Sequence, residues 1–447
     1  MNQYRRIKEY HRQLSQSVLL AGMIQTEEWG KKREYAYTDE DILGLTIDNV
    51  LAPALNGFVV WVLHQALEKH IERLYFLARD GYFMYRTARE YVRAYSLPIE
   101  CRYLYCSRYS VRIPAYYLDE EKALSYITLG GLDVTVKKIY QRAGMKEEQR
   151  EILYKEAVLP YDKNRQILRR EFGQIRDKLR KHELFMKFMR ENSRRALPAY
   201  EQYLSQEGLM DKVKLALVDS GWVGSMQKEL EQSLQRLGRR DSLTGFYWGL
   251  YEIPAGMDRR FYHTYFFSPE GETREKTVFN NCLFETIFTA PHGMTLGYQK
   301  YGEKIEPVLS VMQAERAEKI CVMEKRFAAW QKRFLLQYPG KSFDELAKSY
   351  GQRQTFKAAT KNLVLFMHHP TKEEAQVFGE MEFTDDVLEV RGNRIVTGIS
   401  MRQSAWYEGS TTICSKYPEF SIALCTAYKF LLYRRKKWRY MRREYIT

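Results

Sequence analysis

The chain has 447 residues, of which 45% are hydrophobic, 14% aromatic and 28% charged, a composition that excludes a disordered or low-complexity protein. The six cysteines form no Cys-x-x-Cys pair and the eight histidines show no ligand spacing, so neither a disulfide framework nor a zinc site is predicted. The formal net charge is +15, and because much of it falls in the last twenty residues, a nucleic-acid-binding protein is the least favoured class.

The N-terminal region predicts a helical arm at 4–23 and a polar connector at 25–37. Its start is polar and charged, so we expect no secretory signal and a cytoplasmic protein. Asp39-Glu40-Asp41 contains Asp-x-Asp, but no buried strand precedes it, so it predicts a helix N-terminus with acids in the first turn.

The uncharged stretch 49–67 approaches the length of a membrane span. Pro53, Asn56 and Gly57 interrupt it and its apolar residues recur at helical spacing, which favours a buried core helix near 52–70.

Strands and helices alternate through the middle of the chain. Apolar runs predict strands at 73–78, 101–106, 213–219 and 243–250, with helices after the first and third. Charged, helically periodic segments predict a helical insertion at about 120–210, and further helices are expected at 309–337, 343–352, 355–368 and 371–379. The fold class is therefore α/β, a Rossmann-like parallel sheet with a helical insertion and a helical C-terminal lobe. The expected units are 1–38, 39–305, 306–427 and 428–447.

The turn after the third strand, Asp219-Ser220-Gly221-Trp222-Val223-Gly224-Ser225, is the strongest local signal. Asp219 ends a buried strand, the two glycines permit close backbone approach, and Ser225 stands where a helix begins. Such a helix start is an anion site, since its N–H groups and its dipole attract negative charge. The alternative is an ordinary helix capped by Ser225. No Walker lysine follows, so a P-loop NTPase is excluded.

Other polar groups are expected near this turn, because ligands of parallel sheets bind beyond the carboxyl ends of the strands. Arg79-Asp80-Gly81 ends the first strand, Ser107-Arg108 ends the second, and Glu285 and His292 lie in a later polar segment. Each has a plain structural alternative, such as a surface turn, a helix cap or an exposed histidine. The candidate catalytic residues are Asp80, Asp219 and Glu285, with Asp219 also the candidate ligand for a metal, for which Mg²⁺ is the expected ion. The candidate phosphate- or ligand-binding residues are Arg79, Gly81, Ser107, Arg108, Gly221, Trp222, Gly224, Ser225, Gln227 and His292.

The segments 74–81, 217–227 and 285–293 resemble the C-terminal region of bacterial predicted hydrolases of the haloacid dehalogenase-like (HAD) superfamily, which occur in cell-surface polysaccharide gene clusters. The resemblance covers roughly residues 40–300. In that family a HAD module with a nucleophilic Asp normally precedes this region, and we expect no such module in this chain. The resemblance implies a role in surface polysaccharide biosynthesis.

The order of elements is also similar to that of type I phosphoribosyltransferases. The turn at 79–81 would match their pyrophosphate loop, and Asp219 with Gly224 and Ser225 would match their ribose-phosphate loop. The chain departs from that family because Val218 precedes a single Asp219 where the family has paired acids.

The C-terminal segment 428–447 carries eight basic residues and one acidic residue, hence +7 of the total charge. Tyr433, Trp438 and Tyr440 are interleaved with them. Such a tail suits an anionic membrane surface or nucleic acid, and a solvated basic terminus is the plain alternative.

Two functions from different classes follow from these patterns. The first is binding and transformation of a phosphorylated sugar or nucleotide in surface polysaccharide biosynthesis, by hydrolase-like or transferase-like chemistry. The second is a non-catalytic interaction protein that docks on membrane-associated glycosyltransferases through its basic tail. A deep shared cleft would favour the first, and a flat polar surface would favour the second.

Overall fold

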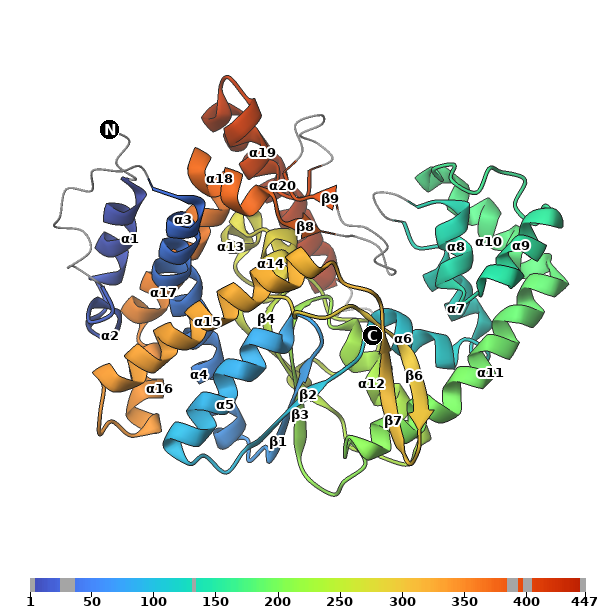
Figure 1. Cartoon of the computed structure of the whole chain (residues 1–447), viewed down its shortest axis with the longest axis horizontal. Helices are drawn as coiled ribbons and strands as arrows, with labels where there is room; N and C mark the ends of the chain where they lie inside the picture. Colours follow the sequence, from blue (N-terminus) through green and yellow to red (C-terminus); the bar gives the residue numbers. More distant parts are fainter. Residues whose placement is uncertain (1–4, 25–36, 131–133, 384–392, 397–403, 443–447) are drawn as a thin grey trace.

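The computed structural model describes residues 5–24, 37–130, 134–383, 393–396 and 404–442. A five-stranded parallel sheet lies at the centre, with helices on both faces (Figure 1). The expected α/β fold class, a Rossmann-like sheet with a helical insertion and a helical C-terminal lobe, is confirmed. Most of the expected connector and the last five residues of the basic tail lie outside the described residues.

The central sheet consists of β1 (Arg73–Leu77), β2 (Glu100–Leu104), β3 (Leu215–Trp222), β4 (Thr244–Leu250) and β5 (Tyr262–Phe267). The strand order is β2-β1-β3-β4-β5, with every pair parallel. The chain runs outward from β1 to β2 on one side, and from β3 to β5 on the other, so the order reverses between β1 and β3. Ligands of open parallel sheets bind at such a switch point.

Both faces of the sheet are covered, because successive side chains of each strand point to opposite faces. On β1, Leu74 and Phe76 join one apolar core with α4 (Ala52–Glu68) and α5 (Gly81–Tyr95). Tyr75 and Leu77 join a second core with α11 (Glu183–Gln206) and α12 (Ser225–Arg236). A strand covered on both faces has a near-continuous apolar sequence, which is why β1 and β3 could be predicted.

The first core also contains helices from both ends of the chain. α1 lies beside α17 in Figure 1, although one comes from the start of the sequence and the other from its last quarter. A single apolar cluster extends from Ile7 to Trp406. The expected N-terminal arm and C-terminal lobe therefore share the core of the α/β unit. The helices are α1 (Arg6–Leu14), α2 (Val18–Ala21), α3 (Asp39–Thr46), α15 (Ala314–Gln337), α16 (Phe343–Gly351), α17 (Arg353–His368) and α18 (Lys372–Gly379).

α3, a π-helical turn (Ile47–Leu51) and α4 form one continuous helical segment, Asp39–Glu68. Among the described residues it is the one helix long and apolar enough to cross a membrane, and 78% of its most apolar stretch is buried in the fold. The interpretation as a core helix is therefore confirmed. The Asp-x-Asp segment also lies at a helix start, where Thr38 Oγ accepts a hydrogen bond from the Asp41 N–H and the Asp41 carboxylate accepts one from the Thr38 N–H.

The helical insertion between β2 and β3 has an apolar core of its own, extending from Ile113 to Met189, and lies to one side of the sheet (Figure 1). α11 joins it to the sheet, because Tyr200 and Tyr203 in its second half belong to the core under the sheet. The insertion comprises α6 (Arg108–Arg112), 3₁₀ turns at Ile113–Ala115 and Arg169–Glu171, α7 (Glu120–Ile127), α8 (Val136–Arg142), α9 (Glu147–Lys155), α10 (Phe172–Lys181) and α11.

Several elements after β4 were not predicted. β5 is an edge strand in which His263, Thr264 and Tyr265 are only half-buried, so it lacks the continuous apolar run of the central strands. An antiparallel hairpin, β6 (Thr295–Tyr301) and β7 (Lys304–Leu309), crosses the expected unit boundary at 305, and the expected boundary at 427 lies inside one helix, α20. The remaining elements are a 3₁₀ turn at Arg259–Phe261, α13 (Thr273–Val278), α14 (Asn281–Ile287), β8 (Glu382–Phe383), β9 (Asn393–Arg394), α19 (Tyr407–Cys414) and α20 (Pro418–Arg442).

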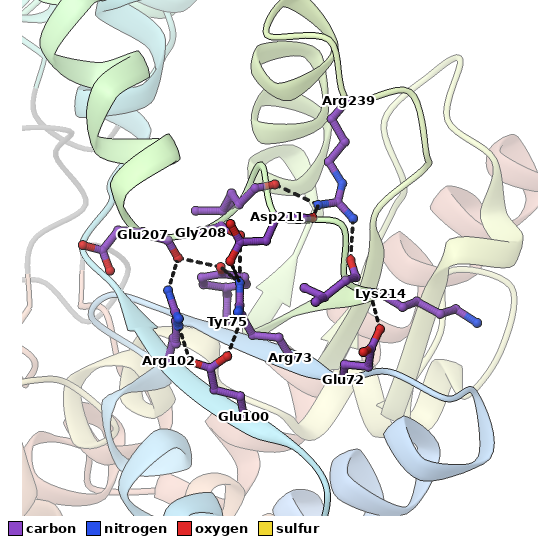
Figure 2. Close-up of polar contacts among 12 residues, drawn as sticks. Glu72, Arg73, Tyr75, Glu100, Arg102, Glu207, Gly208, Asp211, Lys214 and Arg239 are labelled. Carbon is purple, nitrogen blue, oxygen red and sulfur yellow. Dashed lines mark hydrogen bonds and ion pairs between the residues drawn. The ribbon is translucent and has the colours of Figure 1, made fainter.

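Charged side chains at the amino edge of the sheet pair with one another (Figure 2). Arg73 donates to the carboxylates of Glu100 (2.5 Å) and Asp211 (2.7 Å), and to the Gly208 carbonyl (2.8 Å). Arg239 donates to backbone carbonyls of the same loop, among them that of Asp211 (2.9 Å). These contacts tie the loop after α11 to the strands, so this edge is a structural network.

Candidate functional site

A pocket opens at the carboxyl edge of the sheet, at the switch point between β1 and β3. Its volume of about 280 Å³ is close to the lower end of the range of volumes that small-molecule binding sites have. Both polar turns of the sequence contribute to it, together with the ends of β2 and β8 and the start of α14. It is lined by Leu77, Ala78, Arg79, Asp80, Cys106, Ser107, Arg108, Asp219, Ser220, Gly221, Trp222, Val223, Ser225, Met226, Asn281, Glu285, Met294 and Phe383.

The turn after β1 brings Asp80 across to β3. The Ala78–Arg79 peptide bond is cis, and α5 begins directly afterwards. Asp80 holds the N-cap position of α5 without capping it through its side chain. Its carboxylate instead accepts a hydrogen bond from Ser220 Oγ (2.5 Å). The two turns at the switch point are therefore linked directly.

The turn after β3 depends on glycine. Gly221 has φ +117°, and a Cβ there would lie 2.3 Å from the Gly249 carbonyl oxygen, so no other residue fits. Gly224 (φ +65°) is the N-cap of α12, and no side chain caps this helix. Ser225, expected as a possible cap, is instead the first helical residue. The first N–H groups of α12 therefore have no side-chain cap where the helix meets the pocket, an arrangement that favours an anion.

Three carboxyl groups face the pocket, Asp80, Asp219 and Glu285. The pKa of Asp219 is raised to about 8, first by burial and then by the charge of Asp80, against the lowering effect of nearby backbone N–H groups and Arg108. The pKa of Glu285 is raised to about 8 by the same two causes, against Arg108 and a hydrogen bond from the Trp222 indole N–H. Asp219 and Glu285 therefore keep their protons to a higher pH than ordinary carboxyl groups do, and the negative charge of Asp80 contributes to both shifts. Such a set can donate and accept protons during a reaction.

Two arginines balance these acids at the pocket. Arg108 is exposed at the start of α6, and its charge lowers the pKa of both Asp219 and Glu285. Arg79 lines the same pocket. Ser107 lines it too, but its hydroxyl donates to the Thr295 carbonyl (2.6 Å) and accepts the Ser110 N–H (3.0 Å). Ser107 therefore caps α6, which is the structural role that the sequence offered as the alternative to ligand binding.

Four candidate ligand residues do not line the pocket. Gly81 and Gly224 start α5 and α12 beside it. Gln227 was expected to contact the ligand, but its side chain is buried between α12 and β4. It donates a hydrogen bond to the Leu243 carbonyl (2.6 Å) and accepts one from the Tyr247 hydroxyl (2.7 Å). A helix residue two positions after Ser225 points to a different side, which the sequence reading overlooked.

His292 also lies beside the pocket, with both ring nitrogens engaged. Nδ1 is 2.8 Å from the Gly293 carbonyl oxygen and Nε2 is 2.8 Å from the Tyr103 hydroxyl. Burial and, to a smaller extent, the charge of Arg79 lower its pKa, while the Gly293 carbonyl raises it. We therefore assign His292 a structural role, as a neutral ring that holds the Gly293 turn against β2.

Sequence reasoning missed the apolar part of the lining. Phe383 reaches the pocket from β8, and Met294 reaches it from the segment before β6. No local signal marks either residue, because only the tertiary fold brings them near. Asn281, an amide of the polar segment that leads to Glu285, does line the pocket, because it precedes Glu285 by four residues and so shares its face of α14. Burial raises the pKa of the Cys106 thiol, which therefore stays protonated.

Within the described part of the chain, no group of three or more His, Cys, Asp or Glu side chains is arranged to hold a metal ion. Mg²⁺ in phosphate-binding sites commonly uses one or two carboxylates and completes its shell with water and substrate phosphate. Asp219 and Asp80 fit that donor set.

Comparison with protein-family models and with curated proteins finds no match for this chain. The resemblances to HAD-associated proteins and to phosphoribosyltransferases thus stay predictions.

Proposed function

We propose that the chain is an enzyme that binds and transforms a phosphorylated sugar or nucleotide in the pocket at the β1/β3 switch point. The observation that carries the proposal is that Arg79, Asp219 and Glu285 line one pocket, although they come from three distant parts of the sequence. A flat polar surface would have favoured a non-catalytic interaction protein, whereas small-molecule sites are concave with a few convergent polar groups.

In this proposal the phosphate lies against Arg79, Arg108 and the start of α12. Guanidinium groups bind phosphate oxygens in pairs, and uncapped N–H groups add donors with a fixed direction. Asp219 would hold Mg²⁺ or a sugar hydroxyl. A bound Mg²⁺ would supply positive charge beside the phosphate, which would also relieve the repulsion between Asp219 and Asp80.

The carboxyl set supplies the acid–base chemistry. Glu285 keeps its proton near neutral pH and can act as a general acid toward a leaving oxygen, while Asp80 can act as the base toward an incoming hydroxyl or water. The resemblance to HAD-associated proteins would make the reaction a hydrolysis in surface polysaccharide biosynthesis. The resemblance to phosphoribosyltransferases would make it a group transfer. Both belong to the proposal.

Binding calorimetry tests the proposal with a panel of sugar phosphates, sugar nucleotides and nucleotides, with and without Mg²⁺. We expect at least one ligand to bind the wild type, Arg79→Gln to weaken its binding at least tenfold, and Asp219→Asn to remove the Mg²⁺-dependent part. The matched control is Asp258→Asn, since Asp258 is a capping acid of the loop between β4 and β5. It should bind as the wild type does.

Two results would contradict the proposal. If no phosphorylated ligand binds the wild type across the panel, the interaction protein becomes the better assignment. If a ligand binds but Arg79→Gln and Asp219→Asn bind it as tightly as the wild type does, the site lies elsewhere.

A further inference from the structure

The C-terminal helix α20 is fixed to the body of the protein along one face. Ile422 and Tyr440 on this face are buried, and Tyr433 stacks on Tyr251 of the segment after β4 with ring centroids 5.1 Å apart. Lys429 donates a hydrogen bond of 2.6 Å to the buried carboxylate of Glu408 in α19. The helix is therefore an ordered part of the fold, and its opposite face has a defined orientation.

That opposite face exposes large apolar side chains. Six of them are between 53 and 67% exposed. Tyr417 lies directly before α20, and the other five, spaced three, four or seven residues apart, lie along one side of the helix, diametrically across from the buried face. Soluble proteins seldom expose a continuous apolar patch without a binding role. The six residues are Tyr417, Phe420, Leu424, Tyr428, Leu431 and Trp438, and we call them the outer stripe.

The second half of α20 is strongly basic. Between Phe420 and Arg442 the helix contains no acidic residue. Lys429 is paired with Glu408, and the six other basic residues follow in the last three turns. Arg442 stacks over the Trp438 ring at 3.8 Å. The six are Arg434, Arg435, Lys436, Lys437, Arg439 and Arg442.

A groove of about 960 Å³ lies beside α20 and shares Leu431 with the outer stripe. Its wall combines apolar side chains of α17 and α20 with the charged groups Arg12, Arg274 and Lys361, and with the acids Glu9 and Glu419. The positive groups outnumber the acids. The surface next to the stripe is therefore hollowed and apolar, with basic groups among its lining.

We propose that the outer stripe and the basic half of α20 dock the protein on an anionic lipid bilayer, with the helix lying in the plane of the membrane. The apolar side chains would enter below the headgroups, and the arginines and lysines would contact anionic headgroups while their stems cover apolar surface. Charge complementarity selects this partner, since the part of α20 that follows Glu419 combines apolar surface with cations and contains no acid. Nucleic acid would match the cations but leave the stripe in water. This inference is independent of the proposed enzyme activity.

Vesicle co-sedimentation of the full chain tests the proposal, with neutral phosphatidylcholine vesicles and with vesicles that also contain phosphatidylglycerol. We expect binding to the anionic vesicles only, with loss of binding as salt rises from about 0.1 M to about 1 M, because the Debye length falls from about 10 Å to 3 Å. Arg434→Gln with Arg435→Gln should weaken binding roughly 30-fold, since each basic residue near an anionic surface contributes about fivefold. Leu424→Glu with Leu431→Glu should abolish it.

The matched control is Arg169→Gln with Arg170→Gln, two exposed arginines of the helical insertion. It should bind as the wild type does, and circular dichroism should show that every variant is folded. Leu424→Ser with Leu431→Ser provides a milder second variant.

Equal binding to neutral and anionic vesicles would overturn the proposal, as would no binding by the wild type. So would an equal loss from the Arg169 and Arg170 changes, or binding that survives the glutamate changes in the stripe. A wild-type dimer that these glutamate changes dissociate, without vesicle binding, would instead make the stripe an interface between copies.

Discussion

Asp219→Asn should change how the stability of the protein depends on pH. The pKa of Asp219 is about 8 in the folded chain, against 3.8 for an ordinary aspartate. Between these values the folded state keeps a proton that the unfolded state has released. The free energy of unfolding of the wild type should therefore fall as pH rises, by at most about 1.4 kcal/mol per pH unit for one proton. Asparagine has the same shape and can still accept the backbone N–H groups of Ser220 and Gly221, but it carries no charge. The free energy of unfolding of the variant should therefore gain on that of the wild type by about 1–3 kcal/mol between pH 5 and pH 8.

Urea unfolding followed by tryptophan fluorescence measures this difference at several values between about pH 5 and pH 8. Asp258→Asn again serves as the control, because the pKa of Asp258 lies below its ordinary value and the residue is ionised throughout this range. If the difference in free energy of unfolding between Asp219→Asn and the wild type stays constant with pH, the reasoning is refuted. A variant less stable than wild type near pH 8 would also refute it, since that would make the carboxylate a stabilising partner in the fold.

Three further outcomes follow from the geometry. Trp222→Phe removes the indole donor to Glu285, so the pKa of Glu285 should rise and the pH at which ligand binding changes should move upward in calorimetry; an unchanged pH profile would contradict this. Gly221→Ala should lower the free energy of unfolding by about 2–4 kcal/mol, measured by urea unfolding, because the added Cβ meets a backbone oxygen. Arg73→Ala should lower it by about 2–3 kcal/mol, because Asp211 and the Gly208 carbonyl lose a donor and Glu100 keeps only Arg102, while calorimetry should show unchanged ligand binding at the opposite edge of the sheet.

Much of the fold could be predicted from local patterns. The observed bounds of β1 and α15–α18 are within about five residues of the expected ones, because apolar runs and helix caps act through near neighbours in the chain. Thr371, for example, caps α18 in a capping box with Glu374, three residues further along the chain. The edge strand β5 and the hairpin β6–β7 were missed, because their partly exposed residues have no continuous apolar run and their pairing depends on neighbours distant in sequence.

The meeting of Arg79, Asp80 and Asp219 at one edge followed from the sequence alone, because the carboxyl ends of parallel strands meet at the same rim. The directions of the side chains could not be predicted from the sequence. The packing of α12 on the sheet places the amide of Gln227 in the core rather than in the pocket. The pKa of about 8 for Asp219 was also decided only by the tertiary structure. A pKa of this kind depends on burial and on the distance to other charges, and folding sets both by bringing together residues that are far apart in the chain.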